Sequence, residues 1–146
     1  MMWVNYKKLD PAAKIFVYAT AGAVAADIHA LEDCTVVPGR VTMVRTGIAI
    51  QIPDGYVGQV CPRSGLSLKH GITVQNSPGL LDADYRGEVC VLLATNSNKI
   101  FDIKAGDRIA QLLFTQAMRA IFKEVDVLTE TERGEGGFGS TGTESK

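Results

Sequence analysis

Short apolar runs, rich in β-branched residues, recur along most of the chain. They cover residues 15–18, 35–37, 41–44, 48–52, 56–60, 72–74, 89–93, 109–114 and 120–125. Turn-forming sequences separate nearly all of them, among them Pro38-Gly39, Pro53-Asp54-Gly55, Ser77-Pro78-Gly79 and Ala105-Gly106-Asp107. A spacing of about ten residues between short strands is typical of antiparallel sandwiches and barrels, not of βαβ units. The pattern therefore predicts an all-β domain of the β-barrel or jelly-roll kind.

One segment departs from this pattern. Residues 64–70 predict one short helix, with Ser64 as its N-cap and Gly71 as the residue that ends it. Arg63, the Ser64 hydroxyl and the first backbone amides of such a helix would form a cradle for a phosphate group. The alternative is that Ser64 serves only as a structural cap.

The C-terminal stretch from Arg133 to Gly142 has a composition of its own, with five glycines in ten residues. Glycine lets a backbone approach a ligand closely, and Arg133, Ser140 and Thr141 suit phosphate oxygens. Phe138 is free to stack on a flat ring. The alternative is a disordered polar terminus. We expect a β-domain over residues 1–131 and a flexible lid over residues 132–146.

The bulk composition bounds the class of protein. A chain of 146 residues with 46% hydrophobic residues predicts a single globular domain. A net charge of −1 argues against nucleic acid as a partner. The three cysteines are far apart and lack zinc-site spacing, which favours reduced thiols. No signal-peptide or membrane-spanning pattern is apparent, so we expect a cytoplasmic or nuclear protein that is neither secreted nor membrane-bound.

Residues 79–89 concentrate polar groups beside an apolar run. They include three carboxylates, a tyrosine and an arginine between turn glycines. This composition predicts a β-hairpin that presents polar groups at one rim. In an extended segment Asp82 and Asp84 would share one face. The alternative is a solvated hairpin with a weak Asp–Arg pair.

Asp27 is a second candidate acidic site, because small alanines precede it. One carboxylate together with substrate phosphates can hold a hydrated Mg²⁺ ion. The alternative is a turn or cap residue.

Two enzyme classes find no support. The glycines of residues 134–141 have the spacing of a Walker A loop but lack its lysine. Ser64 has neither a visible His/Asp set nor the glycines of a nucleophile elbow.

Four segments together resemble, in order and spacing, the motifs of the homotrimeric dUTP pyrophosphatases (dUTPases). They are Pro62-Arg63-Ser64-Gly65-Leu66, residues 79–89, Gly106-Asp107-Arg108-Ile109-Ala110-Gln111, and residues 133–142. The segment around Asp27 resembles the first of the family's five motifs, with Ala25 where the family usually has glycine. The resemblance implies a trimer whose active sites are each shared by three chains. It also implies hydrolysis of dUTP to dUMP and pyrophosphate by attack of water on the α-phosphorus, which limits dUTP and supplies dUMP for thymidylate synthesis.

The resemblance also assigns roles. Asp82 would be the catalytic base, Asp27 would hold Mg²⁺ through water, and Tyr85 would press on the deoxyribose. Asn76 would contact uracil, on which Phe138 would stack. The residues that would bind the phosphates are Arg63, Ser64, Gly65, Gln111, Arg133, Ser140 and Thr141. Gly139 would lie beside them in the closing tail.

Two other functions are compatible with parts of this pattern. A dCTP deaminase shares the fold and an arginine-serine motif, but Gly65, residues 82–85 and Phe138 favour the dUTPase. A nucleotide-sensing trimer with weak catalysis would use the same site and differ in turnover.

Overall fold

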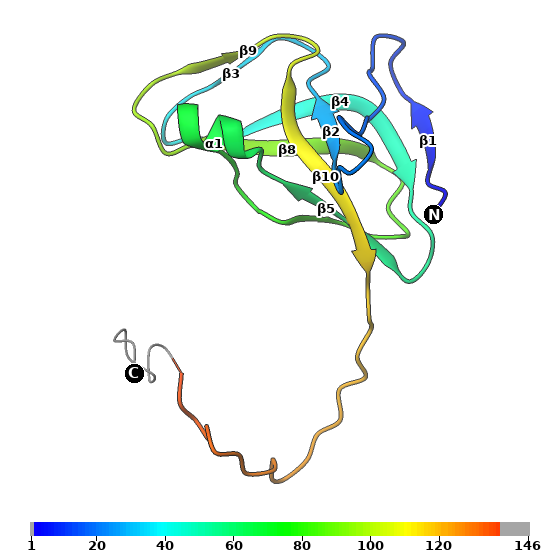
Figure 1. Cartoon of the computed structure of the whole chain (residues 1–146), viewed down its shortest axis with the longest axis vertical. Helices are drawn as coiled ribbons and strands as arrows, with labels where there is room; N and C mark the ends of the chain where they lie inside the picture. The colour runs from blue at the N-terminus through cyan, green and yellow to red at the C-terminus, as the bar shows by residue number, and fades with distance from the viewer. Residues whose placement is uncertain (1, 138–146) are drawn as a thin grey trace.

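The computed structural model describes residues 2–137, and the secondary structure of this part of the chain consists of antiparallel strands and one short helix (Figure 1). Phe138, Gly139, Ser140 and Thr141 lie outside the described residues. The elements in chain order are β1 (Asn5–Lys8), β2 (Ala26–His29), β3 (Cys34–Val36), β4 (Thr42–Gln51), β5 (Tyr56–Cys61), α1 (Ser64–His70), β6 (Ile72–Val74), β7 (Gly79–Leu81), β8 (Glu88–Thr95), β9 (Phe101–Ile103) and β10 (Arg108–Gln116).

The strands form two four-stranded sheets and one two-stranded ribbon. The first sheet has the order β1-β4-β8-β6, the second has the order β2-β10-β5-β7, and β3 pairs with β9. Every pairing is antiparallel. The prediction of an all-β domain with one short helix is confirmed.

Apolar side chains from both sheets join in one core. In β8 buried and half-buried residues alternate, because successive side chains of a strand point to opposite faces. Val89, Val91 and Leu93 are fully buried. They share the core cluster with Ile28 and Leu112 of the second sheet. The opposite face of β8, which carries Glu88, Cys90 and Leu92, borders a cavity described below.

The predicted strands 41–44 and 48–52 are parts of one strand, β4, and the gap between them is a bulge. Arg45 lies opposite Cys90, whereas Ala49 lies opposite Glu88, so β4 contains two more residues than β8 over this interval. Gly47 adopts a φ of 70° there. That conformation favours glycine, which explains why the apolar pattern breaks at this point.

The short helix forms as predicted over Ser64–His70, but its N-cap is Arg63 and not Ser64. Arg63 has extended backbone angles and makes no side-chain cap bond. The helix thus begins one residue earlier than a serine cap would require. Gly71 ends it with a φ of 68°, as the sequence predicted.

Three predicted elements are wrong. Residues 15–18 contribute only an isolated bridge between Val17 and Asp27. Residues 120–125 form no strand. Residues 79–89 are not a hairpin, because β7 pairs with β5 while β8 pairs with β4 and β6. The loop at 82–87 therefore crosses from one sheet to the other, and a turn there replaces the extended conformation expected for Asp82 and Asp84.

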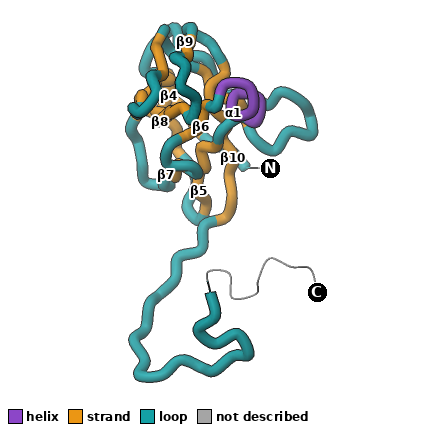
Figure 2. Tube along the Cα trace, turned by 90° about the vertical axis from the view of Figure 1, so that its left-hand side faces the viewer, coloured by secondary structure: helices purple, strands orange, loops and turns teal. Residues whose placement is uncertain are grey.

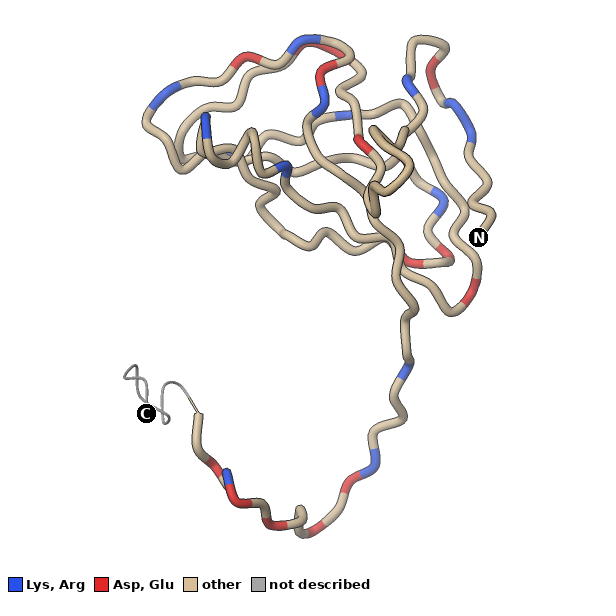
Figure 3. Tube along the Cα trace, in the orientation of Figure 1, with Lys and Arg blue, Asp and Glu red and all other residues tan. Residues whose placement is uncertain are grey.

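After β10 the chain leaves the body as a long arm, residues 117–137 (Figures 1 and 2). The arm has no helix or strand. Acidic side chains recur along it (Figure 3), and large apolar side chains stand exposed between them, including Met118, Ile121 and Phe122 at 95% or more. Within residues 2–137 no helix is long and apolar enough to cross a membrane.

Candidate active site

The second sheet aligns three of the predicted site segments side by side. Gln111 of β10 lies opposite Asp27 of β2 on one side and opposite Cys61 of β5 on the other. The Gln111 side-chain Nε2 donates a hydrogen bond of 2.9 Å to the Pro62 carbonyl oxygen. The sheet register therefore brings Asp27 and Gln111 to the end of β5, where Arg63 and the helix follow.

Asp27 is the centre of an arginine cluster made of Asp27, Arg63, Arg108 and Gln111. Asp27 is buried, and each of its carboxylate oxygens has a cationic partner. Arg63 Nε lies 3.0 Å from Oδ1, and Arg108 Nη1 lies 3.2 Å from Oδ2. Arg63 Nη1 also donates to the Arg108 carbonyl oxygen at 3.0 Å. Two guanidinium groups on one carboxylate leave the cluster with a net positive charge, which suits an anionic ligand.

His29 lies two residues beyond Asp27 on β2 and responds to the same charges. Burial lowers the pKa of His29, and the nearby Lys14 ammonium lowers it further. Its Nδ1 atom is buried and has no hydrogen-bond partner within residues 2–137. The neutral imidazole is thus favoured beside the arginine cluster.

Ser64 and Gly65 are the first two residues of α1, and both are exposed. A Cβ atom built on Gly65 would meet no other atom within 4 Å. Glycine inside a helix costs about 0.5–1 kcal/mol relative to alanine. Packing within one chain therefore does not account for a glycine at this position.

A second site forms where the loops at 75–78 and 82–87 meet the outer face of β8. We call it the loop cavity. Its volume is about 260 Å³, and it is lined by Val60, Val74, Asn76, Gly79, Leu80, Leu81, Asp82, Tyr85, Glu88, Cys90 and Leu92. Three predicted site residues, Asn76, Asp82 and Tyr85, thus share one hollow. Asp82 is exposed, directly after β7, and Tyr85 is 44% exposed.

Asp82 and the arginine cluster lie at different levels along β5. Leu81, just before Asp82, is paired with Gly58, and Arg63 follows Gly58 by five residues. At about 3.3 Å per residue, an extended chain from Gly58 to Arg63 is about 17 Å long. One chain therefore does not bring Asp82 to Arg63, Gln111 and Asp27.

Arg133 lies near the end of the arm formed by residues 117–137. Its Nε donates to the Gly136 carbonyl oxygen at 2.7 Å, and Gly134 N donates to the Thr131 carbonyl oxygen at 3.0 Å. These contacts form a local turn. Arg133 does not reach either site of its own chain.

A sequence model of the dUTPase family matches residues 12–142. The chain belongs to the dUTPase family. It is 49% identical to the deoxyuridine 5′-triphosphate nucleotidohydrolase of Nautilia profundicola, over 97% of this chain and 99% of that protein.

Solved dUTPase structures agree with this assignment. A mutant dUTPase of Staphylococcus bacteriophage 80alpha, solved with dUpNHpp, superposes with a TM-score of 0.90 at 25% identity, over 98% of this chain and 100% of that one. A mutant dUTPase from phage phi11 of S. aureus, described with a structural Mg(II) ion, shares the fold with a TM-score of 0.79 at 22% identity, over 86% of this chain and 98% of that one.

The sequence analysis did not include several residues that the structure places at this dUTPase site. Arg108 shares the Asp27 carboxylate with Arg63, and Glu88, Cys90 and Leu92 line the loop cavity. The available signal for Glu88, Cys90 and Leu92 was that successive side chains of a strand point to opposite faces, so every second residue of β8 lies on the cavity face.

The residues around Asp27 bear on how a metal ion would bind to this dUTPase. Within residues 2–137, no group of three or more His, Cys, Asp or Glu side chains is arranged to hold a metal ion. The Asp27 oxygens are bonded to Arg63 and Arg108, so a lone cation would meet two positive groups. A bound triphosphate would bring negative charge that offsets the positive charge of the two arginines. The donor set thus fits Mg²⁺ that arrives with a nucleotide, not a resident ion.

Proposed function

We propose that this chain hydrolyses dUTP to dUMP and pyrophosphate, with water attacking the α-phosphorus. The observation that carries the proposal is the dUTPase family match over residues 12–142. The 49% identity to a protein named deoxyuridine 5′-triphosphate nucleotidohydrolase supports the choice of substrate. The phage 80alpha relative, solved with dUpNHpp, supports a triphosphate ligand of the same kind.

The loop cavity receives the nucleoside. Asn76 provides amide groups for the polar edge of uracil, and a hydrogen-bonded edge rejects cytosine. Tyr85 lies beside Asp82 in the same cavity and presses on the deoxyribose. Asp82 is exposed, and it orients the attacking water and accepts its proton.

The arginine cluster receives the triphosphate. Arg63, Ser64, Gly65 and Gln111 provide a guanidinium, a hydroxyl, a backbone amide and a side-chain amide, all of which donate hydrogen bonds to phosphate oxygens. These donors stabilise the negative charge that develops on the phosphates during the reaction. Mg²⁺ bound with the triphosphate, and held by Asp27 through water, would add Lewis-acid stabilisation.

A complete active site then requires more than one chain. Asp82 follows the residue that pairs with Gly58, and an extended chain from Gly58 to Arg63 is about 17 Å long. The proposed homotrimer resolves this separation, because the loop cavity of one chain faces the arginine cluster of another. The tail of a third chain, with Arg133, Phe138, Gly139, Ser140 and Thr141, closes over the nucleotide.

The arm supports an assembly of several chains. Its exposed apolar side chains include Ile121, Phe122 and Leu128, which are at least 80% exposed within residues 2–137. Large apolar surfaces of this kind are characteristic of interaction sites. An apolar cleft of about 730 Å³, lined in part by Tyr6, Phe16 and Phe114, is present on the body as a surface of matching chemistry.

Gly65 offers a test that separates binding from folding. Because its Cβ position is open, we expect Gly65→Ala to leave the free energy of unfolding unchanged or raise it by about 0.5–1 kcal/mol. The same change should lower kcat/KM for dUTP by about tenfold, because the added methyl group obstructs the close approach of phosphate to the backbone. Urea denaturation and steady-state kinetics measure the two quantities. Ser67→Ala, also in α1, is a control that should alter kcat/KM little, and unchanged kinetics for Gly65→Ala would remove Gly65 from the site.

The proposed function is tested by measuring pyrophosphate release from dUTP, dCTP, dTTP and UTP in parallel, with Mg²⁺ and with a chelator. We expect release from dUTP alone, and its loss without the metal. Ammonia released from dCTP would instead identify a deaminase. Tight binding of dUTP without turnover would identify a nucleotide-sensing protein.

A further inference from the structure

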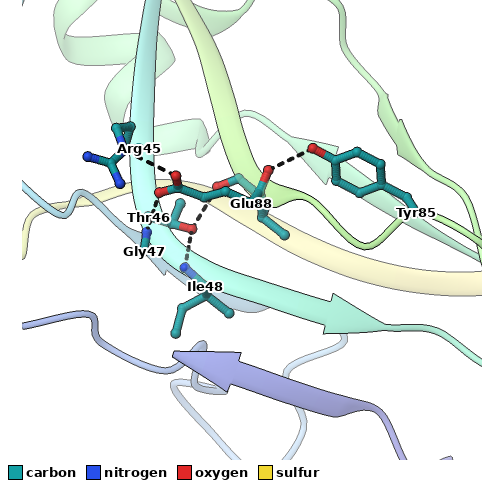
Figure 4. Close-up of polar contacts among 7 residues, drawn as sticks. Arg45, Thr46, Gly47, Ile48, Tyr85 and Glu88 are labelled. Atoms are coloured by element: carbon teal, nitrogen blue, oxygen red, sulfur yellow. Dashed lines mark hydrogen bonds and ion pairs between the residues drawn. The ribbon is translucent and has the colours of Figure 1, made fainter. Parts of the chain in front are cut away.

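Two residues at the start of β8 hold the Tyr85 ring in one orientation. They are Gly87, just before the strand, and Glu88, its first residue. Its hydroxyl donates a hydrogen bond to the Glu88 backbone carbonyl at 3.0 Å (Figure 4). The ring lies across Gly87 so closely that a Cβ atom at Gly87 would overlap the Tyr85 hydroxyl and its ring carbon. The position of the Glu88 carbonyl therefore determines where the Tyr85 ring stands in the loop cavity.

The side chain of Glu88 is fastened to the neighbouring strand. Its Oε1 accepts the Gly47 backbone N–H at 2.7 Å, and its Oε2 lies 3.1 Å from Arg45 Nε (Figure 4). The Glu88 side chain is 17% exposed and that of Arg45 is 45% exposed. An ion pair with such an exposed partner contributes little, so the bond to the Gly47 N–H is the stronger constraint on Glu88.

Gly47 belongs to the β4 bulge, which is itself rigid. The register shift interrupts the ladder between β4 and β8 at this point, and the Glu88 carboxylate serves as acceptor for the Gly47 N–H. Thr46 Oγ1 donates to the Val89 carbonyl oxygen at 2.6 Å, and a Cβ atom on Gly47 would come within 2.8 Å of Ala13 Cβ. A packed bulge with satisfied polar groups is a fixed anchor for Glu88.

We propose that Glu88 is a positioning residue that acts through Tyr85 to discriminate deoxyribose from ribose. Its carboxylate fixes the start of β8 to the bulge, and its carbonyl thereby holds the Tyr85 ring at the wall of the loop cavity. The inference rests on the proposed function, since it concerns the sugar of the same substrate. It assigns a role in specificity to a side chain that need not touch the reacting atoms.

The test compares kcat/KM for dUTP with kcat/KM for UTP. Glu88→Ala removes the acceptor for the Gly47 N–H, and we expect the dUTP/UTP ratio to fall by about tenfold, within the roughly 10²-fold loss that a 1 Å displacement can cause. Glu88→Gln retains an amide oxygen for that N–H, and Arg45→Ala removes only the exposed partner. Both variants should keep the ratio of the parent within about twofold.

Tyr85→Phe completes a double-mutant cycle with Glu88→Ala. It also tests the contact between Tyr85 and Glu88 without changing Glu88, in case Glu88→Ala folds poorly. Tyr85→Phe should lower the ratio to a similar extent, and adding Glu88→Ala to it should lower the ratio little further. Fully additive effects, or a Glu88→Ala ratio equal to that of the parent, would overturn the positioning role. A loss of activity equal for both substrates would also overturn it, because it would indicate only a structural defect.

A direct reading of the ring keeps this role separable from the proposed function. The chain has four tyrosines, so the Tyr85 resonances of ¹³C-tyrosine-labelled protein can be assigned with Tyr85→Phe. We expect these resonances to shift in Glu88→Ala and to stay in place in Glu88→Gln and Arg45→Ala. Unmoved resonances in Glu88→Ala would overturn the link from Glu88 to Tyr85. If the parent protein hydrolyses no dUTP but the Tyr85 resonances shift in Glu88→Ala, the proposed function and the role of Glu88 in sugar discrimination are both overturned. The structural link from Glu88 to Tyr85 would still be established.

Discussion

Asp82→Asn is expected to lower kcat for dUTP by at least roughly 10²-fold, because an amide cannot accept the proton of the attacking water. The substitution keeps the size of the side chain. Asp82 is exposed, and the hydrogen bond that it makes to the Tyr85 N–H uses its backbone carbonyl oxygen. The free energy of unfolding should therefore change by less than about 0.5 kcal/mol.

Asp84→Asn is the matched control. Asp84 is also exposed and lies in the same turn, two residues further along, but it is not among the residues that line the loop cavity. Its kcat should stay within about twofold of the parent. Single-turnover kinetics with Mg²⁺ present measure the chemical step directly. Near-normal turnover by Asp82→Asn would exclude Asp82 as the general base.

The recurrence of short apolar runs between turn sequences predicted the all-β class and most strands, because such runs reflect burial within one chain. It did not reveal which strands pair. The segment at 79–89 has the composition of a hairpin, yet β7 and β8 join different sheets. The local sequence pattern does not show that the chain crosses from one sheet to the other between β7 and β8, since their partner strands β5 and β4 lie far away in sequence.

The pattern also predicted strands that a single chain does not form. Residues 120–125 include a short apolar run, yet Ile121 and Phe122 are almost fully exposed. A strand requires a neighbouring edge to satisfy its backbone groups, and within residues 2–137 the arm pairs with no strand. An apolar run alone therefore does not make a strand.

The motifs in the sequence indicated candidate site residues, but not how the fold arranges them. The motifs indicated Asp27, Arg63 and Asp82, whereas the sheet register separates them into the arginine cluster and the loop cavity. The Glu88 contacts depend on the β4 bulge, whose position follows from packing around Gly47. Such contacts arise from tertiary structure, which spacing along the chain does not specify.

Ending the chain at residue 132 is expected to lower kcat/KM for dUTP by roughly 10²-fold, the loss typical of removing an anion-stabilising donor. The deletion removes Arg133 together with the glycine-rich tail. The described contacts of Arg133 are confined to its own turn, and residues 132–135 are exposed. The melting temperature and the oligomeric state should therefore stay as in the parent, as calorimetry and sedimentation would measure. A truncated protein as active as the parent would exclude the lid.

Mixing this truncated chain with Asp82→Asn chains tests whether the sites are shared. The truncated chain keeps Asp82 and the Asp82→Asn chain keeps its tail, so each alone lacks one part of the site and should show the strongly reduced activity predicted above. If the tail closes over a site whose Asp82 belongs to another chain, every mixed trimer contains one complete site, and activity returns after co-refolding. A tail that serves the Asp82 of its own chain would restore nothing, because no chain in the mixture has both parts.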